Sequence, residues 1–267
     1  AYEIGVRLVG SEMCIRDMYY HASFYDLQAA NVLTAMPNPP EFVYDEIHRA
    51  YACGIKDFWL INCSNVKPHV YLLGFLAELW KRMNADPKAY GKEYVYHYYM
   101  QGSRDDKLSQ ELQDCIQSYF SSMLPYGKRE DEHAGEQFYN YVTRVFIHYW
   151  MKAGGDMPCD ELYWLSDKKD FSGQMEYFAG ICRSGVCMLE QSAVHCAQLG
   201  GKLGENGCLA AKQLWEDSWV LQFKIHAYCA RGVVLFAEAW EAYEKWELVK
   251  AFWYLGQGAD GFKMACD

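Results

Sequence analysis

The sequence predicts a mainly α-helical protein with a small α/β part near its amino end, and two observations carry this prediction. Between residues 18 and 68, two short apolar and aromatic runs flank a helical pattern, the order that a parallel pair of strands requires. Beyond residue 105, amphipathic stripes recur with short glycine-bearing breaks between them, as is typical of a helical bundle.

The α/β part begins with a strand in the run that opens Met18-Tyr19-Tyr20-His21, and a loop is predicted over 26–40. That loop ends in a proline-rich stretch, which can extend neither a strand ladder nor a helix. A helix is predicted over 41–53, because Gly54 stands just beyond its apolar stripe and glycine tolerates the positive φ of a helix end. A second strand follows over 56–62.

The remaining elements are all predicted to be helices. The first lies near 69–83, and the next starts at Asp86-Pro87, where an acid can cap the helix and proline fits its first turn. Further stripes lie in the ranges 108–123, 138–149, 171–199, 221–240 and 248–262, the last through Leu248, Ala251, Phe252, Leu255 and Phe262. The predicted breaks are Pro125 to Gly127, Gly154 to Pro158 and Gly200 to Gly207.

The chain therefore divides into a lead-in over 1–17, an α/β part over 18–100 and a helical bundle over 101–267. The lead-in has no signal-peptide layout, and the stretch from Gly10 to Asp17 resembles a translated sequencing adapter; an ordinary irregular start is the alternative. Under the adapter interpretation the natural protein continues upstream. A two-stranded parallel sheet also needs further elements on its faces and edges, which independently favours upstream sequence.

Composition limits the classes of function. Apolar residues make up 51% of the chain and aromatic residues 16%, so the sequence is not disordered. The net charge of −10 argues against general affinity for nucleic acid or anionic membranes, and no apolar run reaches the roughly 18 residues of a membrane span. The 11 cysteines include no CxxC pair, which favours a reducing, cytoplasmic setting over a secreted one.

Polar residues stand where both predicted strands end, and the carboxyl ends of parallel strands share one rim. The imidazole of His21 can bind a sugar hydroxyl or act as an acid or base near neutral pH; a buried histidine bonded to nearby backbone is the alternative. Asn62 offers amide groups for a hydroxyl or carboxylate, or equally bonds its own turn. Lys67 could pair with an anionic ligand, although an exposed lysine is the commoner outcome.

Aromatic rings near this rim, Tyr20 and Tyr25 among them, suit a carbohydrate site, although rings on strands are more often core. Glycoside hydrolysis needs two carboxyl groups, ~5–5.5 Å apart for retention or ~6.5–9.5 Å apart for inversion. Asp26 is a candidate at the rim, but Asp57 lies at the opposite end of its strand, so the catalytic residues stay unassigned.

The sequence contains no Walker loop, no dinucleotide-binding glycine fingerprint and no HExxH or GxSxG motif, so no cofactor or metal is predicted. Two acid–base pairings can be drawn within helical stretches, Glu190 with His195 and His226 with Arg231. Both stretches are dense in polar residues, so a solvent-exposed or interhelical position is the favoured interpretation of these side chains.

The motifs at 18–68 resemble the late barrel strands of glycoside hydrolase family 115, the xylan α-1,2-glucuronidases. That family has a Tyr-His run with aromatic neighbours and, one strand–helix–strand unit later, a stretch Trp-Ile-Val-Asn-Val-Gly-Asp-(apolar)-Lys-Pro. Here the second motif reads Trp59-Leu60-Ile61-Asn62-Cys63-Ser64-Asn65-Val66-Lys67-Pro68. Ser64-Asn65 replaces the Gly-Asp of the family, which removes a carboxylate from the rim.

The resemblance implies that 18–100 holds the last two βα units of a (β/α)8 TIM-type barrel and that the family's helical domain follows. It implies that His21 and Asn62 contact a glucuronosyl group. The family removes glucuronate or its 4-O-methyl ether from xylan with inversion and without a cofactor.

We therefore expect a glycoside hydrolase of this kind, inactive as this piece, whose partner is a glucuronoxylan oligosaccharide or polysaccharide, with no nucleic acid and no membrane. The open strand edge predicts poor solubility or homo-oligomerisation of the isolated piece. The competing hypothesis is a non-catalytic helical scaffold protein, which a contiguous exposed apolar face on the bundle would favour.

Overall fold

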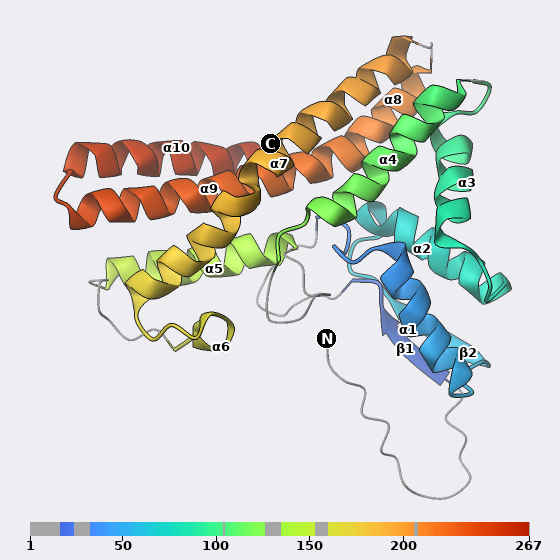
Figure 1. Ribbon diagram of the computed structural model, residues 1–267, viewed down its shortest axis with the longest axis horizontal. Helices are drawn as coiled ribbons and strands as arrows, with labels where there is room; N and C mark the ends of the chain where they lie inside the picture. Colours follow the sequence, from blue (N-terminus) through green and yellow to red (C-terminus); the bar gives the residue numbers. More distant parts are fainter. Residues whose placement is uncertain are drawn as a thin grey trace, which may run out of the picture.

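The computed structural model describes residues 17–23, 33–103, 105–125, 135–152, 160–205 and 208–266 (Figure 1). The α/β part contains β1 (Asp17–His21), α1 (Pro40–Ala52), β2 (Phe58–Asn62), α2 (Val66–Lys81) and α3 (Pro87–Tyr99). The bundle contains α4 (Asp106–Ser122), α5 (Glu136–Met151), α6 (Tyr163–Ser166), α7 (Phe171–Glu205), α8 (Leu209–Trp215), the π-helical η1 (Glu216–Val220), α9 (Leu221–Glu244) and α10 (Leu248–Cys266). The prediction of a mainly helical protein with a small parallel sheet is confirmed.

The sheet consists of β1 and β2, which pair in parallel with Asp17 opposite Phe58 and His21 opposite Asn62. One face is covered: the side chains of Met18, Trp59 and Ile61 on that face pack into the hydrophobic core, and the Trp59 ring meets Trp80 of α2 at 5.0 Å.

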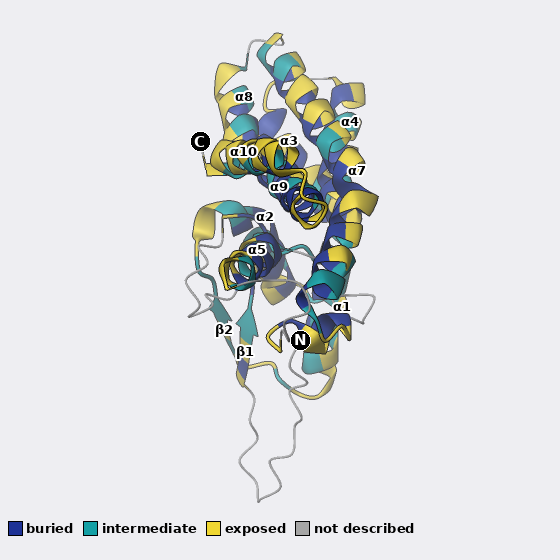
Figure 2. Cartoon of the chain, turned by 90° about the vertical axis from the view of Figure 1, so that its left-hand side faces the viewer, coloured by how far each residue is buried: buried dark blue, intermediate teal, exposed yellow. Residues whose placement is uncertain are grey.

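The described elements leave the other face of the sheet open (Figure 2). On it, Tyr19 is 51% exposed, Phe58 54% and Leu60 52%. Because parallel sheets are normally covered on both faces, three large apolar side chains on an open face mark a surface that another element would cover.

The crossover helix α1 ends as the sequence predicts. Gly54 has a φ of +93°, its N–H donates to the carbonyl of Tyr51, and the N–H of Ile55 donates to the carbonyl of Ala50. These two bonds make a Schellman motif, in which glycine avoids the steric cost of the left-handed region. The chain thereby leaves α1 in the direction that β2 needs.

The contact between α2 and α3 depends on a tyrosine that lies across a glycine. Asp86 caps α3 by accepting a hydrogen bond from the Ala89 N–H at 2.7 Å. One turn later, the hydroxyl of Tyr90 donates to the carbonyl of Tyr71 at 2.8 Å in a buried position. A Cβ atom added at Gly74 would overlap that hydroxyl, so glycine here makes room for the bond.

Long helices dominate the bundle, and one predicted break is wrong. The sequence predicts an interruption from Gly200 to Gly207, but α7 continues to Glu205. A Cβ at Gly200 would lie 3.2 Å from the Trp215 ring, and the Trp215 indole donates to the carbonyl of Cys196 at 2.9 Å. Gly200 therefore allows α8 to pack closely against α7, and it does not end α7.

The predicted apolar stripe of α10 is buried only in part. Ala251 and Gly258 are buried against the neighbouring α9, whereas Leu248 and Phe252 are exposed. The two helices form a hairpin that extends from the bundle (Figure 1), so among the described residues α10 rests mainly on α9. A helix with one neighbour can bury only one narrow stripe.

An aromatic contact joins the α/β part to the bundle. The Tyr71 ring of α2 lies 5.5 Å from the Trp219 ring of η1 and 6.1 Å from the Phe120 ring of α4. The buried apolar residues form one cluster that runs from Met18 to Trp240. The hydrophobic core therefore continues across the predicted boundary at residues 100 and 101.

No helix in the part of the chain that the structure describes is both long and apolar enough to cross a membrane.

The packing at Gly74 makes a testable prediction. Gly74→Ala should lower the free energy of unfolding by about 1–2 kcal/mol, because overpacking outweighs the helix propensity gained, about 1 kcal/mol. Gly180→Ala in α7 is the matched control, since nothing lies within 4 Å of its added Cβ, and it should be neutral or stabilising. Urea unfolding measures both; equal stability of the two variants would contradict the α2–α3 contact.

Candidate functional site

The candidate site lies at the rim where β1 and β2 end. Parallel pairing places His21 beside Asn62, and the Asn62 amide nitrogen lies 3.2 Å from Nδ1 of His21. An amide nitrogen only donates, so Nδ1 is the acceptor and Nε2 carries the proton of the neutral ring. The Tyr19 ring meets the imidazole edge to face at 4.5 Å. The rim thus presents an oriented imidazole with an aromatic neighbour.

Backbone and hydroxyl groups hold this rim together beyond the last residues of the strands. The Ala22 N–H donates to the carbonyl of Asn62 at 2.9 Å. The Ser23 hydroxyl accepts from the Ser64 N–H at 2.8 Å and lies 2.8 Å from the Ser64 hydroxyl. These bonds, which the sequence analysis missed, fix the spacing of His21 and Asn62.

The substituted Ser64-Asn65 pair leads into α2. Ser64 makes the rim contacts to Ser23, and the carbonyl of Asn65 lies 2.7 Å from Nδ1 of His69. His69 is fully buried, and burial lowers its pKa. This histidine was not among the predicted site residues. Because His69 follows Asn65 by four residues, about one helical turn, a contact between the two at the start of α2 could have been predicted.

The structure separates Tyr20 and Lys67 from the His21–Asn62 pair. Side chains alternate along a strand, so Tyr20 lies on the covered face, where burial and then the nearby Glu46 raise the pKa of its phenol. Lys67 is exposed, and its Nζ lies 3.9 Å from a carboxylate oxygen of Asp217 in η1. The other two predicted substrate contacts, Tyr25 and Asp26, lie outside the described residues.

The acidic residues of the two strands lie at the amino ends, opposite the rim that His21 and Asn62 form. Asp17 begins β1, and Asp57 immediately precedes β2. At ~3.3 Å per residue, four residues of strand place Asp17 ~13 Å from His21. Within the described ranges, no three His, Cys, Asp or Glu side chains gather closely enough to hold a metal ion.

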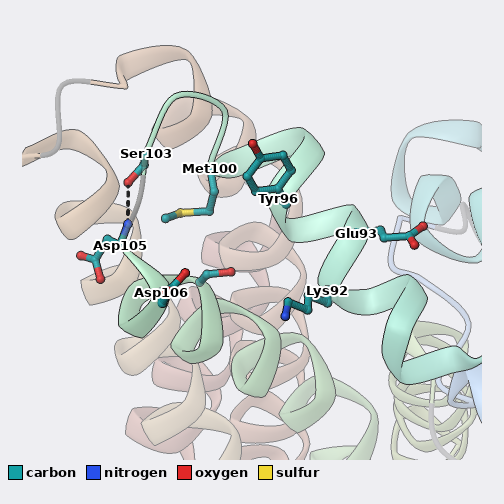
Figure 3. Close-up of a pocket in the computed structure, with 8 residues that line it drawn as sticks. Lys92, Glu93, Tyr96, Met100, Ser103, Asp105 and Asp106 are labelled. Carbon is teal, nitrogen blue, oxygen red and sulfur yellow. Dashed lines mark hydrogen bonds between the residues drawn. The ribbon is translucent and has the colours of Figure 1, made fainter.

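A hollow of about 230 Å³, whose lining includes no residue of the rim, lies between α3 and α4 (Figure 3). Lys92, Tyr96, Met100 and Asp106 line it, together with Asp105. The Asp105 carboxylate is engaged as the cap of α4, where it accepts from the Leu108 N–H at 2.9 Å. The hollow therefore has the character of a helix junction rather than of a binding site.

Structural contacts engage Glu190, Arg231 and His226, three of the side chains in the two acid–base pairings. Glu190 of α7 forms a two-bond ion pair with Arg231 of α9, at 2.9 and 3.0 Å, which confirms the interhelical interpretation of those two side chains. His226 is fully buried; its Nε2 lies 3.1 Å from the Tyr119 hydroxyl, and burial lowers its pKa to about 3.

A rim of polar side chains at the ends of parallel strands is where α/β enzymes place their chemistry. The chain is related to the glycoside hydrolases. Residues 12–130 match the model of glycosyl hydrolase family 115, a range that contains both rim motifs and reaches past the end of α4. The resemblance seen in the motifs is confirmed over this range. Comparisons with curated proteins and with solved structures give no match.

The hydrogen bond between His21 and Asn62 can be tested by nuclear magnetic resonance. Asn62→Leu removes the donor to Nδ1, so the ratio of Nε2-protonated to Nδ1-protonated His21 should fall about fivefold, as the loss of ~1 kcal/mol implies. The ¹⁵N shifts of the ring nitrogens report this ratio. Ser64→Ala alters the same rim without touching His21 and should leave it unchanged; an unchanged ratio in Asn62→Leu would contradict the contact.

His226 makes a prediction about pH. Its pKa is lowered to about 3 in the folded state, so the unfolded chain binds more protons below pH ~6.5 and stability falls as the pH falls. Between pH 7 and 4.5 this one group should cost about 2–3 kcal/mol. His226→Asn should flatten the pH dependence of urea unfolding, and His97→Asn, at an exposed site on α3, should not.

Proposed function

We propose that the rim of β1 and β2 is one wall of a carbohydrate site in a family 115 type glycoside hydrolase. Its ligand is an α-linked glucuronate, or the 4-O-methyl ether, on a xylan-type polysaccharide. The observation that carries the proposal is the hydrogen-bonded pair of His21 and Asn62, which stands beside Tyr19 on the open face of the sheet. The family match over residues 12–130 supports it.

The open face of the sheet supports a barrel. Tyr19, Phe58 and Leu60 point to that face, while α1 and α2 belong to the covered side of the sheet. In a (β/α)8 barrel, helices cover the outside and side chains fill the inside. We propose that further parallel strands cover this face and complete the barrel, with His21 and Asn62 at its carboxyl-terminal mouth.

Within this site we assign sugar binding, and not proton transfer, to His21 and Asn62. Inverting hydrolysis needs a carboxylic acid and a carboxylate on opposite sides of the scissile bond. Asp17 and Asp57 stand at the amino ends of the strands, so neither can serve at this rim. We therefore propose that the chain by itself binds the sugar without releasing glucuronate.

Binding can be measured by titration calorimetry with a xylo-oligosaccharide that carries one 4-O-methylglucuronosyl branch. His21→Ala and Asn62→Ala should each weaken binding about tenfold, because a hydrogen bond to a charged group contributes ~1.5–3 kcal/mol. Asp57→Asn, at the far end of β2, is the control and should keep the wild-type affinity. Equal affinity for unbranched xylotriose would refute uronate recognition, and glucuronate release by the chain would refute the binding-only role.

One observation favours a second candidate, a helical interaction protein. At the α9–α10 turn, Trp246 is 84% exposed, Val249 87% and Phe252 79%. Trp246 also has a φ of 59°, a conformation that costs a residue other than glycine ~1–2 kcal/mol. Exposed apolar side chains beside a strained tryptophan fit an interface, which we propose joins two copies of this chain.

Sedimentation velocity tests this second candidate. Val249→Lys and Phe252→Lys should convert a concentration-dependent dimer into a monomer while leaving the helical circular dichroism unchanged. Leu209→Lys is the matched control, because Leu209 is also highly exposed, at 72%, but lies on α8, outside the turn. A wild-type chain that is monomeric at micromolar concentrations would refute self-association through this surface.

A further inference from the structure

Two buried thiols face each other where α4 packs on α7. Cys115 of α4 is 2% exposed and Cys196 of α7 is fully buried, and both are free thiols. Burial raises the pKa of the Cys196 thiol, and the Cys115 thiol, which lies within hydrogen-bonding reach, raises that pKa further. The two sulfur atoms are therefore neighbours inside the bundle.

The alignment of the two helices independently places these cysteines opposite each other. α4 and α7 run antiparallel (Figure 1), and an ion pair between Glu111 and Lys202, at 2.5 Å, fixes their alignment. At a rise of ~1.5 Å per residue, Cys115 lies ~6 Å along α4 from Glu111, and Cys196 lies ~9 Å along α7 from Lys202. The two cysteines thus stand at nearly the same level of the helix pair.

The two helices also pack closely. Cα atoms of α4 and α7 come within 8 Å of one another, and a Cβ added at Gly185 of α7 would overlap Leu124, which lies just beyond α4. Disulfide bonds join residues whose Cα atoms are up to ~7 Å apart. Helices packed this closely bring facing side chains into the range that a disulfide spans.

We infer that Cys115 and Cys196 are a redox site of the bundle, which closes under oxidising conditions into a disulfide that fastens α4 to α7. The inference does not depend on the proposed sugar site. In a reducing setting the pair stays as two thiols, and a free buried cysteine then acts as a small hydrophobe.

The oxidant is a small-molecule disulfide such as oxidised glutathione. One protein thiol loses its proton, attacks the S–S bond, forms a mixed disulfide and releases one reduced glutathione. The second protein thiol also loses its proton and displaces the other glutathione. Two protein thiols are thereby oxidised to one disulfide, and one glutathione disulfide is reduced to two thiols.

Burial makes this site slow to react in the folded chain. The thiolate is the reacting species, and a thiol whose pKa is raised by burial forms little of it. The disulfide therefore forms during folding or when the helix pair opens, and once formed it is shielded from reductants. Cys187, which is exposed on the same helix, can react without such an opening.

The bond lies close to the junction between the bundle and the α/β part. One helical turn after Cys115, the rings of Tyr119 and Phe120 meet Trp219 of η1 at 5.5 and 6.4 Å. Trp219 in turn packs on Tyr71 of α2. Closing the pair therefore fastens the helix that carries these junction rings.

Refolding in a glutathione buffer tests the inference. The reduced chain is unfolded in urea, diluted into a mixture of oxidised and reduced glutathione, alkylated at its remaining thiols and digested with trypsin. Mass spectrometry should find peptide 108–128, which contains Cys115, linked to peptide 184–202, which contains Cys187 and Cys196. Cys187→Ala is the matched control and should keep this link, whereas Cys196→Ala should lose it.

The oxidised wild-type chain should also unfold at a urea concentration about 1 M higher than the reduced chain, because a cross-link between distant residues restricts the unfolded state. Cys196→Ala, carried through the same buffers, should show equal midpoints. Cys115→Ala provides the same two measurements from the α4 side if Cys196→Ala fails to fold.

A refolded wild-type chain without the link between 108–128 and 184–202 would overturn the inference, as would an equal amount of that link in Cys196→Ala. A linked chain whose urea midpoint is not raised would overturn the fastening of α4 to α7.

Discussion

The parallel pairing of β1 with β2 is the constraint on which the rest of the α/β part depends. It brings the two strand ends to one rim and so sets His21 opposite Asn62. It also requires a crossover, which α1 supplies, and a sharp exit from that helix, which Gly54 supplies. Finally, a parallel sheet needs cover on both faces, and the described chain covers one.

The bundle supports this unit rather than standing apart from it. The Tyr71 ring of α2 inserts among aromatic rings of the bundle, so that the hydrophobic core is continuous. Hydrogen bonds to Leu33–Ala35 add directional contacts where apolar packing alone would leave the backbone unpaired. Small residues at helix contacts, such as Gly74 and Gly200, allow aromatic side chains to approach the backbone.

The relation to the glycoside hydrolases suggests one explanation for the rim and the open face of the sheet. The matched range contains the rim, and the rim offers an oriented imidazole, an amide and an aromatic ring, which are suited to binding a sugar. The acidic residues of the two strands lie at the other end, which is why we propose sugar binding as the role of His21 and Asn62. Two apolar surfaces, one on the sheet and one at the α9–α10 turn, are where further elements or copies would fit.

The local features of the fold could be predicted from the order of residues. The strand–helix–strand order, the end of α1 at Gly54 and the start of α3 at Asp86 follow from short-range patterns. The parallel pairing that this order requires then predicts that His21 and Asn62 share one rim. Features that depend on contacts between residues distant in the chain could not be predicted in this way. Gly200 was predicted to end a helix, but it lies within α7, where Trp215 packs against it. The apolar stripe of α10 was predicted to be buried, but its one neighbouring helix, α9, covers only part of it. The bonds from the bundle to Leu33–Ala35 join residues 84 to 187 positions apart, a separation at which periodicity and capping rules carry no information.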